Sequence, residues 1–189
     1  MRNSLLILVL AVTMISCNST QNIVVEEVKE KELAKMIENK NFKFVAETAS
    51  PIAQREINQL TFLLPQGSSP NRILLTGGED YFKMMGDSIA VDMAYFGTRQ
   101  MGGPYESGRT GVQLNVKPTL YEANYDERKK IYRVKYKAND KRESYNFVIK
   151  IFHNKKAQMY LSTSHRTAIN YKGYVTEAVK VETEKSIIP

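Results

Sequence analysis

Alternation of apolar and polar residues constrains the fold of this chain more than any other feature of its sequence. It is clearest over residues 132–138, where Tyr, Val, Tyr and Ala alternate with Arg, Lys and Lys. Successive side chains of a strand point to opposite faces of the sheet, so this pattern predicts a strand with one buried and one hydrated face. Nine further segments are predicted as strands: 42–48, 73–75, 81–85, 89–93, 112–116, 121–125, 145–151, 159–161 and 169–175.

Short strands separated by frequent turns favour antiparallel packing. The strands do not alternate with helices, which argues against a parallel α/β sheet. The predicted fold class is mainly β, an antiparallel β-sandwich or open barrel of about 8–10 strands with one N-terminal amphipathic helix. Residues 61–64 could form one more short strand before Pro65.

The predicted helix covers residues 24–40. Its apolar residues recur at helical spacing and form a narrow stripe, which must pack on another element. The stripe consists of Val25, Val28, Leu33, Met36 and Ile37.

The N-terminus has the layout of a secretory signal peptide. Arg2 precedes an apolar run over residues 5–15, which is too short to cross a bilayer because a spanning helix needs about 20 residues. The segment Met14-Ile15-Ser16-Cys17 resembles the lipobox of bacterial lipoproteins, in which the peptide is cleaved before the cysteine and the thiol carries lipid. Cys17 is the only cysteine in the chain.

These features predict a signal peptide over residues 1–16 and a lipidated tether over 17–23. One β-rich domain follows over 24–176, with a loosely ordered tail over 177–189. The chain lacks the aspartate that follows the cysteine in many inner-membrane lipoproteins, since Asn18 stands there. We therefore expect an exported protein on the periplasmic side of the outer membrane.

Positive charge is concentrated in the C-terminal half. Residues 128–172 contain thirteen Lys or Arg residues and two acidic ones, whereas the whole chain has a net charge of +7. A basic face formed by Arg133, Lys135 and Lys137 would suit an anionic lipid, a glycan or an acidic envelope protein. The alternative is an ordinary hydrated strand face. The export signal argues against nucleic acid as the partner.

A glycine-rich segment over residues 97–111 is the other candidate site. Aromatic rings can stack on a sugar, and arginine can grip a carboxylate or phosphate. The alternative is a long hairpin loop whose aromatic residues plug the end of the core. The candidate ligand-binding residues are Tyr95 and Phe96, which lead into this segment, and Arg99, Tyr105 and Arg109 within it.

The sequence predicts no catalytic residue, metal site or cofactor. His153 and His165 lack carboxylates at metal-ligand spacing. The leading hypothesis is a lipid-anchored, non-catalytic binding or interaction module for an anionic or glycan-like ligand. One alternative is an envelope hydrolase using Asp92 or His165 with Glu106. A second is a structural subunit that docks through the helix over residues 25–37.

Several motifs resemble a family of small Bacteroidota lipoproteins described as domain of unknown function 4251. They are Tyr81-Phe82-Lys83, Gly86-Asp87-Ser88, Tyr95-Phe96-Gly97 and Gly103-Pro104-Tyr105, with residues 44–49 and 164–171 at the two ends. The resemblance covers about Phe42 to Val175. It implies a lipid-anchored envelope protein and supplies no activity, ligand or catalytic residue.

Overall fold

The computed structural model describes residues 19–52, 58–75, 77, 79–100, 111–140 and 143–178. The predicted signal peptide, Cys17 and the tail beyond residue 178 lie outside this part of the chain. The described elements are α2 (Ser19–Glu38), β1 (Asn41–Pro51), η1 (Asn58–Leu63), β2 (Ile73–Leu74), β3 (Tyr81–Met85), β4 (Ser88–Met93), β5 (Val112–Val116), β6 (Leu120–Asp126), β7 (Ile131–Asn139), β8 (Ser144–Phe152), β9 (Lys156–Thr163) and β10 (Ile169–Glu177).

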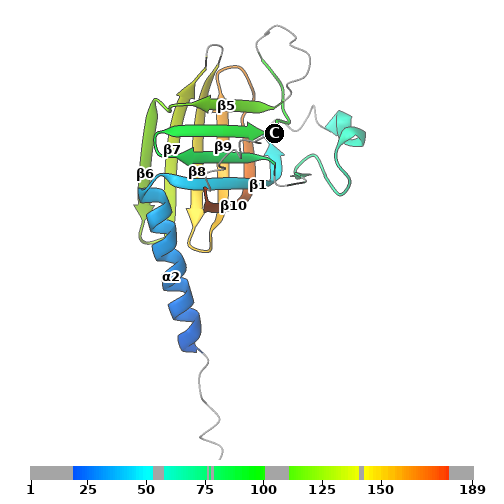
Figure 1. Ribbon diagram of the computed structural model, residues 1–189. Helices are drawn as coiled ribbons and strands as arrows, with labels where there is room; N and C mark the ends of the chain where they lie inside the picture. The colour runs from blue at the N-terminus through cyan, green and yellow to red at the C-terminus, as the bar shows by residue number, and fades with distance from the viewer. Residues whose placement is uncertain are drawn as a thin grey trace, which may run out of the picture.

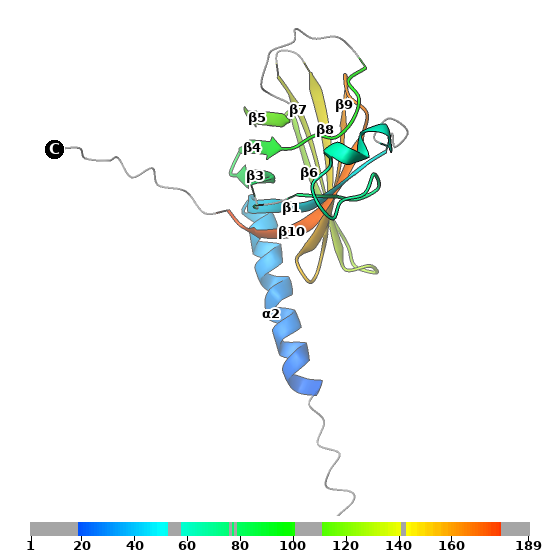
Figure 2. The same cartoon turned by 90° about the vertical axis from the view of Figure 1, so that its right-hand side faces the viewer.

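The strands form one antiparallel sheet in the order β5-β4-β3-β1-β10-β9-β8-β7-β6, with β2 paired to β1. The sheet curls into a half barrel. Figure 1 shows β5, β4, β3 and β1 stacked across the front, with the strands β7–β9 running steeply behind them. These two groups of strands form the two walls of the half barrel, which Figure 2 shows from the side. The predicted mainly β, antiparallel class is confirmed, and the open-barrel form is the one adopted.

The core lies between the two walls. The apolar residues of each alternating strand point inward, and their side chains meet across the barrel. The Phe82 ring on β3 lies 4.8 Å from the Tyr136 ring on β7 and 5.2 Å from the Phe147 ring on β8, measured between centroids. These contacts join strands that are far apart in the sheet order, so the curl is held by the packing of aromatic side chains.

Strands β1 and β10 approach each other closely at the centre of the sheet. A Cβ atom on Gly173 would lie 1.9 Å from the Val45 carbonyl oxygen, so only glycine fits there. The register between the two strands shifts at Ala46 and Thr48, next to this contact. Bulges of this kind increase local twist, which suits a sheet that must curl.

Helix α2 closes one end of the half barrel with its C-terminal half. Leu33 and Ile37 are buried in the core, as the predicted stripe requires. The helix begins at Ser19 rather than Val24, so residues 19–23 of the predicted tether are helical. It ends at Glu38 rather than Lys40, because Lys40 adopts a left-handed backbone with a φ of 50°. No helix in the described ranges is long and apolar enough to cross a bilayer.

Most predicted strands occur within a few residues of their expected bounds. Residues 61–64 are an exception, because 61–63 belong to the 3-10 helix η1. Phe62 and Leu63 there are 80% and 67% exposed, so neither side chain has the buried partner that a core strand would give it.

Candidate functional site

The outer face of β6, β7, β8 and β9 carries a hollow of about 500 Å³, which we call the basic hollow. Four basic residues line it and only one carboxylate does. The lining residues are Asn124, Tyr125, Asp126, Lys129, Ile131, Arg133, Lys135, Lys150, Phe152 and Gln158.

The register of the sheet places two cations side by side at the centre of the basic hollow. Arg133 on β7 is the cross-strand partner of Lys150 on β8, and both are exposed on the outer face. Asn124 lies beyond Arg133, and Gln158 lies beyond Lys150. Like charges directly opposite each other destabilise a sheet slightly, and an anion bound over this row would offset that cost.

Nearby carboxylates are already engaged. Glu122 pairs with Lys135 at 3.3 Å, and Asp126 accepts a hydrogen bond from the Lys129 backbone at 3.1 Å. No ion pair joins Arg133 or Lys150 to another residue in the described part of the chain. The centre of the basic hollow therefore has two cations available to an anion.

The predicted basic face is divided by the structure. Arg133 and Lys135 line the basic hollow, whereas Lys137 lies farther along β7 between Leu120 and Asn146, outside it. Lys129 and Lys150 belong to the site but were not among the predicted residues. Their charge was evident in the basic stretch, but the cross-strand register that brings them to Arg133 cannot be derived from alternation alone.

The first residues of the predicted loop site contact the connection between β9 and β10. Tyr95 donates a hydrogen bond to the Thr167 carbonyl oxygen at 2.6 Å, and Phe96 packs against the core. Arg99 is exposed and forms an isolated β-bridge with Arg166. Tyr105 and Arg109 lie outside the described residues.

A buried ion pair lies at this same end of the sheet. Arg166 Nε is 3.1 Å from Glu143 Oε2, and the Glu143 side chain is only 1% exposed. Thr163 and Tyr145 also donate to this carboxylate, and Arg166 donates to the Gly111 carbonyl oxygen at 3.0 Å. Burial raises the pKa of Tyr145, which keeps its hydroxyl protonated as a donor. Every charge here is matched within the protein, which is typical of a structural cluster.

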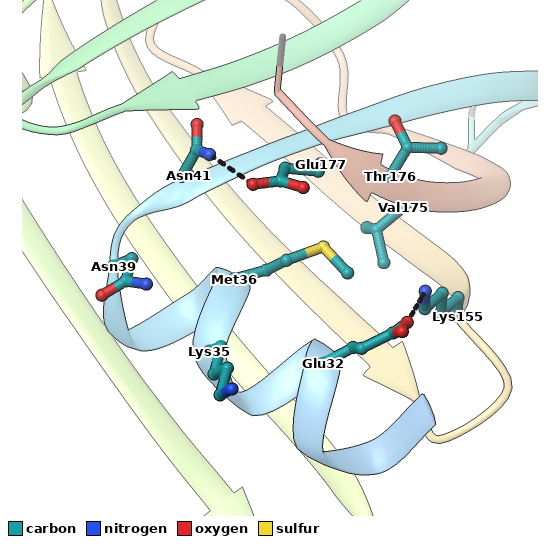
Figure 3. A pocket seen from close by; sticks show the side chains of 9 residues that line it. All are labelled: Glu32, Lys35, Met36, Asn39, Asn41, Lys155, Val175, Thr176 and Glu177. Atoms are coloured by element: carbon teal, nitrogen blue, oxygen red, sulfur yellow. Dashed lines mark hydrogen bonds and ion pairs between the residues drawn. The ribbon is translucent and has the colours of Figure 1, made fainter. Parts of the chain in front are cut away.

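A second hollow of about 440 Å³ separates α2 from the ends of β1 and β10 (Figure 3). One ion pair and one hydrogen bond from a neutral amide engage three of its four charged side chains. Lys155 Nζ lies 2.8 Å from Glu32, and Asn41 donates to Glu177 at 3.2 Å. Met36 points between these pairs toward Val175. Because its lining carries two acidic and two basic residues, this hollow offers no net charge to a ligand.

The residues proposed for a hydrolase lie on separate elements. Asp92 is exposed on β4 and accepts a hydrogen bond from Gln113, and His165 lies in the β9–β10 connection. Glu106 is outside the described residues. Among the residues that the structure describes, no three His, Cys, Asp or Glu side chains are grouped to hold a metal ion.

Residues 25–175 match the family described as domain of unknown function DUF4251. The chain belongs to the DUF4251 family. A crystal structure of a DUF4251 family protein from Bacteroides eggerthii DSM 20697 has a similar fold, with a TM-score of 0.55 at 10% identity over 79% of this chain and 88% of that one. At that identity the likeness concerns the fold alone. No curated protein matches the sequence.

The DUF4251 match extends from α2 into β10. It therefore includes all four strands that line the basic hollow. It also includes both partners of the buried Glu143–Arg166 pair.

Proposed function

We propose that this DUF4251 protein is a lipid-anchored envelope protein whose domain binds an anionic ligand in the basic hollow without catalysing a reaction. The observation that carries the proposal is the cross-strand pairing of Arg133 with Lys150 in a hollow with four basic residues and one carboxylate, Asp126, which already accepts a hydrogen bond from the Lys129 backbone. An anion over this pair would remove the repulsion between the two cations.

The lining suits a phosphate or carboxylate carried on a larger molecule. Arginine can bind either group through two parallel hydrogen bonds. The amides of Asn124 and Gln158 lie at the two ends of the cationic row and can bind hydroxyl groups. Ile131 and Phe152 are cross-strand partners beside it and offer a partly apolar surface. A glycan or lipid head group bearing the anion fits this combination.

The anchor in this proposal is an acyl-modified Cys17 on the periplasmic side of the outer membrane. The lipobox-like segment over residues 14–17 supports it. Helix α2 begins at Ser19, two residues after Cys17, so the anchor would join the domain almost directly through a helix. Confinement to the envelope would give the basic hollow phosphorylated lipids and glycans as partners and would keep it from nucleic acid.

Titration of the protein with inorganic phosphate and with glucuronate tests the proposal. Ionic strength is held constant with chloride, and binding is followed through the backbone amide NMR signals of β7 and β8, which every variant retains. We expect saturable binding that weakens at least about tenfold in the Arg133→Gln/Lys150→Gln variant, because two charge-assisted contacts are removed. Lys150→Gln alone should also raise the free energy of unfolding by about 0.5 kcal/mol, since it removes the repulsion with Arg133.

Lys137→Gln is the matched control. It removes one positive charge, against two in the double variant, from the same face of β7 but outside the basic hollow, and should leave binding unchanged. Equal losses in Lys137→Gln and in the double variant would indicate a diffuse charge effect, and would contradict a specific site. The absence of saturable binding to either probe would also contradict it.

A further inference from the structure

The end of the sheet nearest the start of helix α2 is basic. Figures 1 and 2 show the helix running beyond the strands on the same side as the β6–β7 and β8–β9 turns. Two contacts hold this arrangement, because Tyr125 on β6 donates to Glu30 at 2.6 Å and Lys155 pairs with Glu32 at 2.8 Å. The hydrogen bond to the Glu30 carboxylate raises the pKa of Tyr125 to about 12, so the hydroxyl keeps its proton and acts as the donor.

Four cations are exposed at this end, against two exposed carboxylates, Asp126 and Glu127, at the start of the same turn, so its net charge is about +2. Arg128, Lys129 and Lys130 follow one another in the β6–β7 turn, and Lys156 begins β9. We call these four residues the basic end. It is continuous with the basic hollow, because Lys129 belongs to both.

Backbone geometry at the turns shows that lysine stands where another residue would be more stable. Lys130 has a φ of 51° and Lys155 has a φ of 62°, in the left-handed region that glycine and asparagine adopt more readily. In the β8–β9 turn, Lys155 has the ion pair with Glu32 to offset this conformation. No ion pair joins Lys130 to another of the described residues.

We propose that the basic end contacts the anionic phospholipid surface of the membrane that holds the anchor, and tilts the domain onto it. This rests on the proposed acylation of Cys17. Each cation near an anionic surface contributes about 1 kcal/mol. An upright helix would hold the turn about 16 Å above Ser19, at 1.5 Å per residue from Glu30, and the attraction decays over about 8 Å. The contact therefore requires a tilted helix on anionic membranes, whereas a neutral membrane does not favour tilting.

Energy transfer to labelled head groups tests the inference on the acylated, full-length protein in vesicles. A fluorophore on Asn154→Cys reports the β8–β9 turn, and one on Ser164→Cys reports the opposite end of β9. Adding phosphatidylglycerol to phosphatidylcholine vesicles should raise transfer from position 154 about twofold over position 164, because the basic end approaches the surface. Salt should reverse the increase.

The Arg128→Gln/Lys129→Gln/Lys130→Gly variant should return transfer to the value on neutral vesicles. Glycine at position 130 suits the positive φ, so loss of folding would not explain the change. Lys137→Gln is the control and should change nothing. Transfer that ignores phosphatidylglycerol, or that survives the triple variant, overturns the inference. Transfer lost only in Arg133→Gln/Lys150→Gln also overturns it, by moving the lipid contact to the basic hollow.

The failure of the anchor is distinguishable from the failure of this inference. Wild-type protein that does not float with neutral vesicles lacks a working anchor, which contradicts the proposed function before orientation is measured. Protein that floats but shows equal transfer from positions 154 and 164 on both membranes contradicts only the basic-end contact.

Discussion

Two large buried tyrosines of the core, Tyr171 and Tyr136, differ in whether the hydroxyl group has a hydrogen-bond partner. Tyr171 donates to the Ala94 carbonyl oxygen at 2.9 Å, which ties the end of β4 to β10. The buried Tyr136 hydroxyl has no hydrogen-bond partner among the described residues. Burial raises the pKa of both, so both hydroxyls stay neutral. An unsatisfied buried hydroxyl carries a desolvation cost that no contact offsets.

Replacing each tyrosine by phenylalanine should therefore have opposite effects. Tyr136→Phe should raise the free energy of unfolding by about 1 kcal/mol, because it removes the unsatisfied group and keeps the ring. Tyr171→Phe should lower it by about 1 kcal/mol, because the Ala94 carbonyl loses its donor. Denaturant unfolding measures both. Destabilisation by Tyr136→Phe would show that its hydroxyl has a partner after all.

At the scale of elements, the buried Glu143–Arg166 pair joins three connections. Glu143 precedes β8, Arg166 follows β9, and Gly111 precedes β5. The Arg166 guanidinium also lies 5.3 Å from the centre of the Tyr95 ring. A buried charge left without its partner is costly, whereas an apolar pair of similar size often is not.

Arg166→Met should accordingly lower the free energy of unfolding by about 3–5 kcal/mol. The double variant Glu143→Leu/Arg166→Met should recover most of that loss, because no uncompensated charge remains. Thermal and denaturant unfolding of the two single variants and the double variant give the coupling. Additive losses would mean that the two side chains do not act as a pair.

The strands of this fold could be predicted from the sequence, and their order could not. The alternation over residues 132–138 matches β7, and Gly86 with Asp87 forms the predicted turn between β3 and β4. Alternation shows which face of each strand is buried, but it does not show which strands lie next to one another in the sheet. The insertion of β1 between β3 and β10 depends on packing across the barrel, such as Phe82 against Phe147.

The candidate site was predictable to a similar extent. Arg133 and Lys135 were identified from their exposed positions, because charge and period are both local. Lys150 was missed as a site residue because its position opposite Arg133 depends on the β7–β8 register. The aromatic and arginine residues of the loop stay a predicted site, and within it Tyr95 bonds to Thr167 across 72 positions of sequence. Such distant contacts are not visible in a local pattern.

In the whole molecule, the cationic surfaces and the helix that leads to the proposed anchor lie on the same side of the domain. The basic hollow and the basic end occupy the outer face and the turns of β6–β9, and helix α2 leaves the domain on the side of those turns. This arrangement would turn the cationic surface toward an anionic membrane only if Cys17 carries the lipid. The proposed membrane contact and the proposed envelope ligands therefore both depend on the acylation of Cys17.

Intact mass spectrometry of the membrane-fraction protein, beside a Cys17→Ala variant, tests this acylation most directly. We expect a wild-type mass that corresponds to a chain beginning at Cys17 plus acyl chains, and the variant should lack both the cleavage and the added mass. An unmodified wild-type chain would contradict the anchor. It would also remove the reason to restrict the partners of the basic hollow to the cell envelope.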